Sequence, residues 1–279
     1  MRKITTETIK AFKNYLLNEE RASSTVKKYL HDICVFQMWL AEQELCKETV
    51  LSYKSYLCEQ YAPVSVNAAL SSLNSLFSFM EWYDLRVKTI KIQRQIFAST
   101  EKELTKTEYD RLLQAANQRK NKSLYLLIQT ICSTGIRVSE VCYITVEAVS
   151  RGIAEINCKG KHRQVFLPKQ LCQILKQYIK DRKIKSGVVF VTKNGNPLNR
   201  SNIWSDMKRL CKEANVSEKK VFPHNLRHLF ARTYYRLQKD IVRLADILGH
   251  SSVNTTRIYT KETGEIHRRQ IQKLGLLRC

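Results

Sequence analysis

Apolar side chains in the first 85 residues recur every three or four positions, which is the spacing of one face of an α-helix. The pattern predicts four helices, in the segments ITTETIKAFKNYLLNEE, SSTVKKYLHDICVFQMWLAEQ, KETVLSYKSYLCEQ and VSVNAALSSLNSLFSFMEWYD. Ser65 is placed as the N-cap of the fourth helix, after a break at Ala62-Pro63. We therefore predict an N-terminal four-helix bundle that forms a domain over residues 1–85.

The pattern changes directly after this domain. Residues 86–100 contain Arg86, Lys88, Lys91 and Arg94 and no acidic residue. We interpret residues 86–102 as an extended basic linker. A surface strand or loop of the following domain is the alternative.

Residues 103–279 combine helical periodicity with short β-rich runs. Thr105 and Glu108 have the spacing of a capping box, and the helix SLYLLIQTICSTG is expected to end at Gly135. The runs GIAEIN, RQVFLP and VVFVT are typical of strands, and a turn from Cys158 to His162 joins the first two. The fold class predicted for the whole chain is mostly α, with a small three-stranded antiparallel sheet in the second domain.

Charge divides the chain in the same way. Its 279 residues include 48 Lys and Arg against 25 Asp and Glu, a net charge of +23. Residues 1–85 contain 9 basic and 10 acidic residues, so the excess belongs to residues 86–279, with 39 against 15. This excess favours a polyanionic partner, and nucleic acid rather than a membrane, because no basic amphipathic helix dominates.

Cysteine usage and hydropathy indicate where the protein works. The nine cysteines form no CxxC pair, and no signal peptide precedes them, which favours reduced thiols. No apolar run approaches the roughly 18 residues that span a bilayer. We expect a cytoplasmic protein with no membrane partner.

The stretch PHNLRHLFA raises the question of a metal or an anion site. His224 and His228 share one helix face at i and i+4, but Arg227 lies between them and the motif contains no acid. Arg227 would repel a cation by about 4 kcal/mol per unit charge at 4 Å and an effective dielectric near 20, and would attract an anion equally. Pro223 also suits a helix N-terminus, where anions bind. We predict a phosphate clamp and no metal.

Four further polar residues have ordinary explanations when taken singly. Lys159 in a turn is usually solvated, and Arg137 at a helix start can be a surface charge. His250 follows a helix-ending glycine, where a histidine usually caps or packs. Tyr259 is one of 13 tyrosines.

Taken together, STGIRVSE, CKGKHRQVFLP, HNLRHLFA and ILGHSSVNTTRIYT closely resemble, in order and spacing, the motifs of the tyrosine recombinases, the phage integrases and Xer-type enzymes. The successive intervals are 3 residues from His224 to Arg227, 23 from Arg227 to His250 and 9 from His250 to Tyr259. The helical segment before the motifs is similar to the family's core DNA-binding domain, so the resemblance covers nearly the whole chain.

The resemblance implies a catalytic domain over residues 103–279 and a role for each motif residue. The implied catalytic set is two arginines, a hairpin lysine, two histidines and a nucleophile: Arg137, Arg227, Lys159, His224, His250 and Tyr259. The two guanidiniums would hold a DNA phosphate and help the phenol ionise. Lys159 would protonate the departing 5′ oxygen, so the implied product is a 3′-phosphotyrosine and no cofactor is needed.

The family also implies partners. These are double-stranded DNA with inverted-repeat core sites, three further copies of the chain in a tetramer, and a C-terminal segment exchanged between subunits. A second recombinase or a directionality factor is a further candidate, and the protein would be nucleoid-associated. Relatives carry a basic bundle whereas residues 1–85 are near neutral, so we expect local DNA contacts from Thr25, Lys27, Lys28, Lys54, Arg86, Lys88 and Lys161.

Two other functions stay open at this point. A type IB topoisomerase uses a similar constellation but relaxes DNA as a monomer. A non-catalytic DNA-binding protein would need no nucleophile, although all six catalytic positions hold competent residues here. Integration, excision, inversion and dimer resolution cannot be told apart from these motifs.

Overall fold

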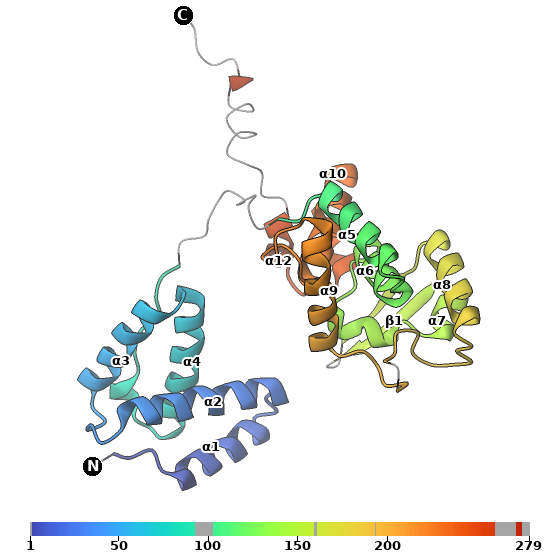
Figure 1. The fold of residues 1–279 in the computed structure, drawn as a ribbon. Helices are drawn as coiled ribbons and strands as arrows, with labels where there is room; N and C mark the ends of the chain where they lie inside the picture. Colours follow the sequence, from blue (N-terminus) through green and yellow to red (C-terminus); the bar gives the residue numbers. More distant parts are fainter. Residues whose placement is uncertain (1, 93–102, 159–160, 193, 260–271, 275–279) are drawn as a thin grey trace, which may run out of the picture. The chain divides into compact units, whose positions relative to one another are not determined.

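The computed structural model describes five stretches of the chain: residues 2–92, 103–158, 161–192, 194–259 and 272–274 (Figure 1). They are mostly helical, as predicted. The chain divides into two compact units, residues 1–94 (unit 1) and 95–279 (unit 2), and each has its own hydrophobic core. None of the described helices is long and apolar enough to cross a membrane.

The described residues of unit 1 form four α-helices and a short 3-10 helix: α1 (Thr6–Asn18), α2 (Ser23–Leu40), α3 (Lys47–Gln60), α4 (Pro63–Phe79) and η1 (Tyr83–Leu85). Helices therefore occupy the four predicted segments. The expected cap at Ser65 is wrong, because α4 begins at Pro63 with Ala62 as its N-cap. Proline at the first helical position has the right φ and no N–H to satisfy, so it starts the helix earlier.

The core of unit 1 is aromatic and encloses one buried acid. Phe12, Phe36 and Phe77 are fully buried. Asp32, which is 8% exposed, accepts a hydrogen bond from Ser72 Oγ at 2.7 Å and forms an ion pair with Lys28. The buried carboxylate is therefore paired, as burial requires.

Residues 86–92, the first half of the predicted linker, belong to unit 1, where two asparagines hold them against α4. Asn74 donates to the Val87 carbonyl at 2.8 Å and accepts from the Val87 N–H at 2.9 Å. Asn67 makes the same pair of bonds with Ile90, at 2.9 and 2.7 Å. Each asparagine amide thus makes the pair of backbone hydrogen bonds that a neighbouring strand would otherwise make. The second half of the predicted linker, residues 93–102, lies outside the described residues.

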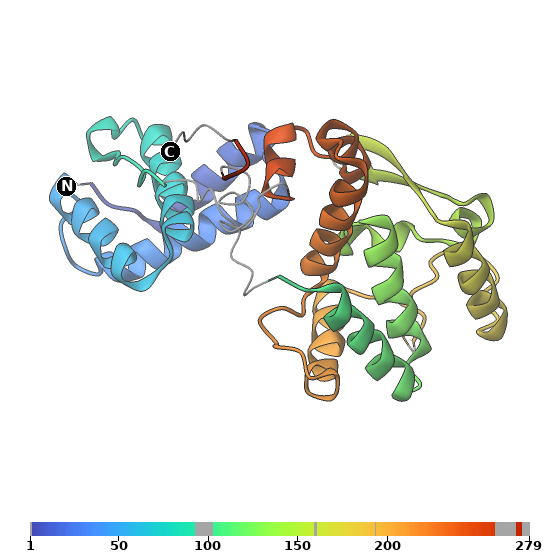
Figure 2. The same cartoon turned by 90° about the horizontal axis from the view of Figure 1, so that it is seen from above.

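Unit 2 is built around α6. Its helices are α5 (Lys106–Gln118), α6 (Lys122–Thr134), η3 (Val138–Tyr143), α7 (Val146–Arg151), α8 (Lys169–Asp181), α9 (Arg200–Ala214), α10 (Pro223–Gln238), α11 (Ile241–Leu248), α12 (Val253–Thr256) and η4 (Arg257–Tyr259). Helix α6 contacts α5, α8, α9 and α10 (Figures 1 and 2). The capping box of Thr105 and Glu108 is confirmed, and so is the end of α6 at Gly135, which has a φ of 65°.

The predicted three-stranded sheet is wrong for the described residues, because it has two strands. Strands β1 (Ile153–Cys158) and β2 (Lys161–Phe166) pair antiparallel, with Ile156 opposite Arg163. The run VVFVT makes isolated bridges, from Val188 to Thr145 and from Val191 to Pro197. Its backbone bonds go to neighbouring loops instead of β1 or β2, and its apolar side chains fill the core of unit 2.

Candidate active site in unit 2

The C-terminal end of α11 gathers three arginines that are far apart in the sequence. Three successive backbone carbonyls there accept hydrogen bonds, Ile247 from Arg163 at 2.7 Å, Leu248 from Arg227 at 2.6 Å and Gly249 from Arg137 at 3.0 Å. The last carbonyls of a helix have no intrahelical donor and carry the negative end of its dipole. This helix end therefore holds guanidinium groups that would otherwise repel one another.

Arg227 is the most deeply placed of the three. It is 1% exposed, donates from Nη1 to the Gly135 carbonyl at 2.5 Å, and has Nη2 3.1 Å from Nε2 of His250. Burial and the positive charge of Arg137 lower the pKa of Arg227 to about 10. The guanidinium therefore stays protonated at neutral pH.

A buried carboxylate links the other two arginines. Glu140, 5% exposed, receives Nη1 of Arg137 at 2.9 Å on one oxygen and Nη2 of Arg163 at 2.5 Å on the other. Burial alone would raise the pKa of Glu140, but hydrogen bonds from both arginines outweigh it and lower that pKa. Glu140 is therefore ionised and bridges Arg137 to Arg163.

Tyr259 lies in the same cluster as the arginines. It is 5% exposed, and its ring packs edge-on to His228 at 5.0 Å and stacks near His250 at 6.2 Å between centroids. Burial raises the pKa of Tyr259, while the charges of Arg227 and Arg137 act against that rise. The arginines thus favour the phenolate as expected, but in the DNA-free protein burial outweighs them.

His250 uses both ring nitrogens inside the protein. Nδ1 is 2.8 Å from Oγ1 of the buried Thr256, and Nε2 faces Nη2 of Arg227. Arginine can only donate, so Nε2 accepts and the proton lies on Nδ1. Burial, followed by Arg227, lowers the pKa of His250 to about 4. In this tautomer Nε2 carries no proton, so His250 could donate a hydrogen bond to a phosphate from Nε2 only after that nitrogen is protonated.

His224 and His228 lie one turn apart on α10, as the spacing predicted. Their ring centroids are 4.4 Å apart. His224 is exposed, and its pKa is lowered by partial burial of the ring and by Arg227, Arg137 and Arg200. His228 has a buried Nε2 with no partner among the described residues, and burial lowers its pKa to about 3.

These two depressed values predict acid-sensitive folding. Between about pH 4 and 6.5, His228 and His250 bind protons in the unfolded chain but not in the folded protein. Their contribution is complete above pH 6.5 and is lost as pH falls, by up to about 1.4 kcal/mol per pH unit for each histidine. Urea unfolding at several pH values should show a flatter slope for His228→Gln. Exposed His31→Gln is the control, and equal slopes in wild type and His228→Gln would contradict the assignment.

A cleft of about 360 Å³ opens beside the cluster. Arg137, His224 and Arg227 line it, together with Arg200 and Trp204 of α9. A phosphodiester could enter here, because three arginines and a histidine face the space. No group of three or more His, Cys, Asp or Glu side chains suited to a metal ion occurs in the described part of the chain.

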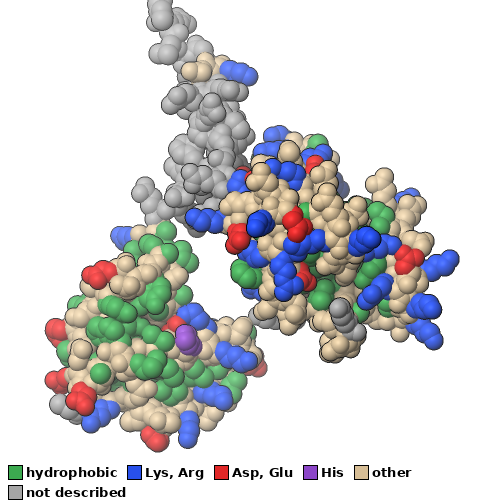
Figure 3. All heavy atoms as spheres, in the orientation of Figure 1, with side chains coloured by type: hydrophobic (Ala, Val, Ile, Leu, Met, Phe, Trp, Pro, Cys, Tyr) green, Lys and Arg blue, Asp and Glu red, His purple; other side chains and the backbone are tan. Residues whose placement is uncertain are grey.

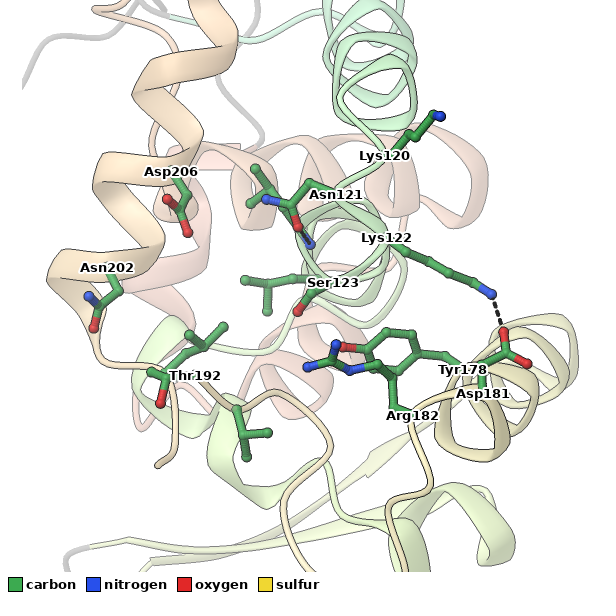
Figure 4. Close-up of a pocket in the computed structure, with 14 residues that line it drawn as sticks. Lys120, Asn121, Lys122, Ser123, Tyr178, Asp181, Arg182, Thr192, Asn202 and Asp206 are labelled. Carbon is green, nitrogen blue, oxygen red and sulfur yellow. Dashed lines mark hydrogen bonds and ion pairs between the residues drawn. The ribbon is translucent and has the colours of Figure 1, made fainter. Parts of the chain in front are cut away.

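A second cavity of about 490 Å³ lies between α6, α8 and α9 and contains none of the predicted catalytic residues (Figure 4). Lys122 and Asp181, which lie at one side of it, form an ion pair at 2.5 Å. The larger cavity is therefore not where the motif residues meet.

The remaining predicted site residues are placed as follows. Lys159 lies outside the described residues, and Lys161 begins β2 without a described side chain. The six predicted DNA contacts of unit 1 are Thr25 and Lys54, both half-buried, and Lys27, Lys28, Arg86 and Lys88, all exposed. Of the predicted C-terminal exchange segment, residues 260–271 and 275–279 lie outside the described residues.

Five residues of the cluster and of the cleft beside it were not predicted: Glu140, Arg163, Arg200, Trp204 and Thr256. Glu140 stands three residues after Arg137 in STGIRVSE, Arg163 is in CKGKHRQV and Thr256 is in ILGHSSVNTTRIYT, so three of them belong to motifs already noted. Arg200 and Trp204 carry no sequence signal, since their place beside the cleft depends on how α9 packs.

Comparison with known proteins finds the family that the sequence motifs resemble. The model of the phage integrase family matches residues 102–265, and that of the phage integrase N-terminal SAM-like domain matches residues 9–83. The tyrosine recombinase XerA of Thermococcus kodakarensis is 30% identical over 97% of this chain and 96% of its own length.

Two solved structures share the fold. One is the XerH site-specific recombinase bound to difH substrate in a pre-cleavage complex, with a TM-score of 0.71, 19% identity and coverage of 97% of this chain and 85% of that one. The other is a lambda integrase tetramer bound to a Holliday junction, with a TM-score of 0.72, 17% identity and coverage of 91% and 76%.

Proposed function

Because the chain belongs to the phage integrase family of tyrosine recombinases, we propose that it cuts and rejoins DNA at specific sites through a covalent bond to Tyr259. The observation that carries this proposal is that Arg137 and Arg227, which line one cleft, also act on the buried phenol of Tyr259 within a single chain. No ATP is consumed, because one phosphoester replaces another and the bond energy is kept.

The roles follow from the chemistry of each group. The phenol oxygen of Tyr259 attacks the phosphorus, the bond to the 5′ oxygen breaks, and the product is a 3′-phosphotyrosine with a free 5′-hydroxyl. Arg137 and Arg227 hold the non-bridging oxygens, where negative charge grows in the transition state. His224, at the mouth of the cleft, accepts the phenolic proton or holds the phosphate, and Lys159 protonates the departing 5′ oxygen.

The two units would share the work on DNA. We assign residues 1–85 to a core DNA-binding domain, 86–102 to a basic linker and 103–279 to the catalytic domain with its C-terminal exchange segment. Lys and Arg side chains are spread over the visible face of unit 2 (Figure 3), which supports a broad phosphate-binding surface there. In unit 1, the best-placed candidates for phosphate contacts are Arg86 and Lys88. Both are exposed and flank the buried Val87 in the segment 86–92.

This assignment predicts a change in salt dependence. The double variant Arg86→Ala/Lys88→Ala should bind its DNA more weakly and lower the slope of log K against log salt by about 2, since each phosphate contact contributes about 0.9. Fluorescence anisotropy between 50 and 200 mM salt measures the slope. The control is Lys10→Ala/Lys13→Ala, which removes the same charge from exposed positions of α1. A slope in Arg86→Ala/Lys88→Ala equal to that of wild type would exclude these two residues as phosphate contacts.

The assembly on DNA is proposed from the family. A fold relative is a tetramer on a Holliday junction, and we infer a homotetramer on paired inverted-repeat sites. A second recombinase or a directionality factor is an additional candidate partner. We also propose that the protein acts in the cytoplasm at the nucleoid, because its substrate is DNA. Integration, excision, inversion and dimer resolution are all compatible with this chemistry.

The experiment that tests the proposal traps the covalent intermediate. A nicked duplex carrying the candidate inverted repeats loses a short fragment after cleavage, so the adduct accumulates and is seen as a slower band in a denaturing gel. Wild type should give the adduct and Tyr259→Phe should not. An adduct in Tyr259→Phe, or none in wild type on any repeat that it binds, would contradict the proposal. Cleavage of arbitrary plasmid by a monomer would favour a type IB topoisomerase instead.

A further inference from the structure

Arg163 has a position in unit 2 that the proposed reaction does not use directly. Its side chain is 12% exposed and extends from β2, opposite Ile156. One Nη nitrogen donates to the Ile247 carbonyl at 2.7 Å, and the other donates to Glu140 Oε2 at 2.5 Å. Arg163 does not line the cleft beside the arginine cluster.

Each of these two bonds leads to a residue of the proposed active site. Glu140 uses its other oxygen to hold Nη1 of Arg137. The Ile247 carbonyl belongs to the helix end whose next carbonyl holds Arg227, and His250 follows two residues after that one. A single guanidinium therefore connects both phosphate-binding arginines.

Packing gives a third constraint. A Cβ added at Gly249 would lie 2.4 Å from Cδ of Arg163, so the arginine stem lies directly against the glycine that ends α11. The stem leaves no room for another side chain at this turn. Arg163 thus fixes the end of α11 by contact as well as by hydrogen bonding.

We propose that Arg163 is a positioning residue that holds Arg137, through Glu140, and the end of α11 in the geometry needed for phosphate binding. This inference rests on the proposed recombinase function. Lysine cannot replace Arg163, because one ammonium on a flexible stem does not present two separated donors to Glu140 and Ile247. Arg163 acts on the rate of the chemical step and not on the affinity for DNA.

The test compares Arg163→Met and Arg163→Lys with wild type in single-turnover cleavage of the suicide duplex at saturating protein. We expect rates about 100-fold lower for methionine and about 30-fold lower for lysine, the size expected when transition-state donors are misplaced. DNA affinity should stay within about threefold, since no phosphate contact is lost. Arg151→Met, which removes an exposed arginine of α7, is the control and should cleave like wild type.

Two readouts separate positioning from general support of the fold. Arg163 and Glu140 act through one contact, so the effects of their substitutions should overlap. Adding Arg163→Met to Glu140→Gln should lower the cleavage rate further by less than about threefold, as coupled residues do. A substrate with sulfur at the 5′ bridging position, whose leaving group needs no proton, should not restore the rate of Arg163→Lys. The cleavage rate of each variant is corrected for its folded fraction, which is measured by thermal unfolding.

The outcomes are decisive for Arg163. Cleavage by Arg163→Lys within threefold of wild type, full additivity with Glu140→Gln, or rescue by the sulfur substrate would each overturn the inference. Rescue in particular would assign the defect to proton donation by Lys159. Failure of wild type to form the Tyr259 adduct is a separate result, and it would overturn the proposed function instead.

Discussion

Replacing Arg227 with lysine will lower the rate of DNA cleavage by about 10³-fold, the effect of losing a transition-state donor. Arg227 holds the Gly135 and Leu248 carbonyls and faces His250 while it lines the cleft. A lysine keeps the charge but cannot make these divergent contacts and bind a phosphate at once. DNA affinity should change by no more than a few-fold, because many other cations contact the backbone.

The measurement for Arg227 is single-turnover formation of the covalent adduct, beside a binding titration on the same duplex. Arg236→Lys is the matched control, since Arg236 is an exposed arginine in the last turn of the same helix. Cleavage by Arg227→Lys within a few-fold of wild type would remove Arg227 from the catalytic set. A parallel loss in Arg236→Lys would point to a general effect on α10.

Replacing Gly249 with alanine will impair both stability and cleavage. Gly249 has a φ of +62°, where an L-residue costs about 1–2 kcal/mol, and the new Cβ would be 2.4 Å from Cδ of Arg163. Arg163 is tied at both ends of its guanidinium and cannot move aside without losing Glu140 or Ile247. We expect a loss of about 3 kcal/mol in unfolding free energy and about 100-fold in cleavage rate.

Gly152 is the matched control for this prediction. It also ends a helix with a positive φ, +76°, but a Cβ there would meet nothing within 4 Å. Gly152→Ala should therefore lose only the backbone cost of about 1–2 kcal/mol and cleave like wild type. Urea unfolding and adduct formation measure both variants. Equal losses in the two variants would show that the contact with Arg163 has no consequence.

The sequence predicted helices well because their signals are local. Periodicity located the helices of unit 1, and the Thr105 capping box and the end at Gly135 follow from side chains within one turn. The errors concern competition between signals. Pro63 overrode Ser65 at the start of α4, since proline has a φ suited to the first helical position and one N–H fewer to satisfy.

The prediction of a third strand failed because strand pairing depends on tertiary contacts. The run VVFVT has the β-branched composition of a strand, but composition does not say which backbone will be its partner. Val189 and Phe190 are fully buried, so the apolar residues of the run serve the core of unit 2. Their hydrogen-bond partners come from loops at Ile144 and Leu198, which periodicity cannot identify.

The sequence named residues that the structure brings together, but not the residues that support them. Arg137, His224, Arg227, His250 and Tyr259 lie in one region of unit 2, and their catalytic roles stay a prediction. The role of Arg163 depends on the approach of β2 to α11. The sequence also could not predict the electrostatic environment of these side chains. The raised pKa of Tyr259 results from burial, which the motif alone does not express.

The helix end that binds the three arginines has an evolutionary consequence. Its acceptors are peptide oxygens, which every residue type possesses, so side-chain replacements at Ile247 or Leu248 remove none of them. These oxygens also do not titrate, so acidification cannot switch off this part of the anchorage. Substitutions that accumulate in this stretch during evolution can therefore alter packing, while the backbone oxygens that anchor the guanidinium groups are retained.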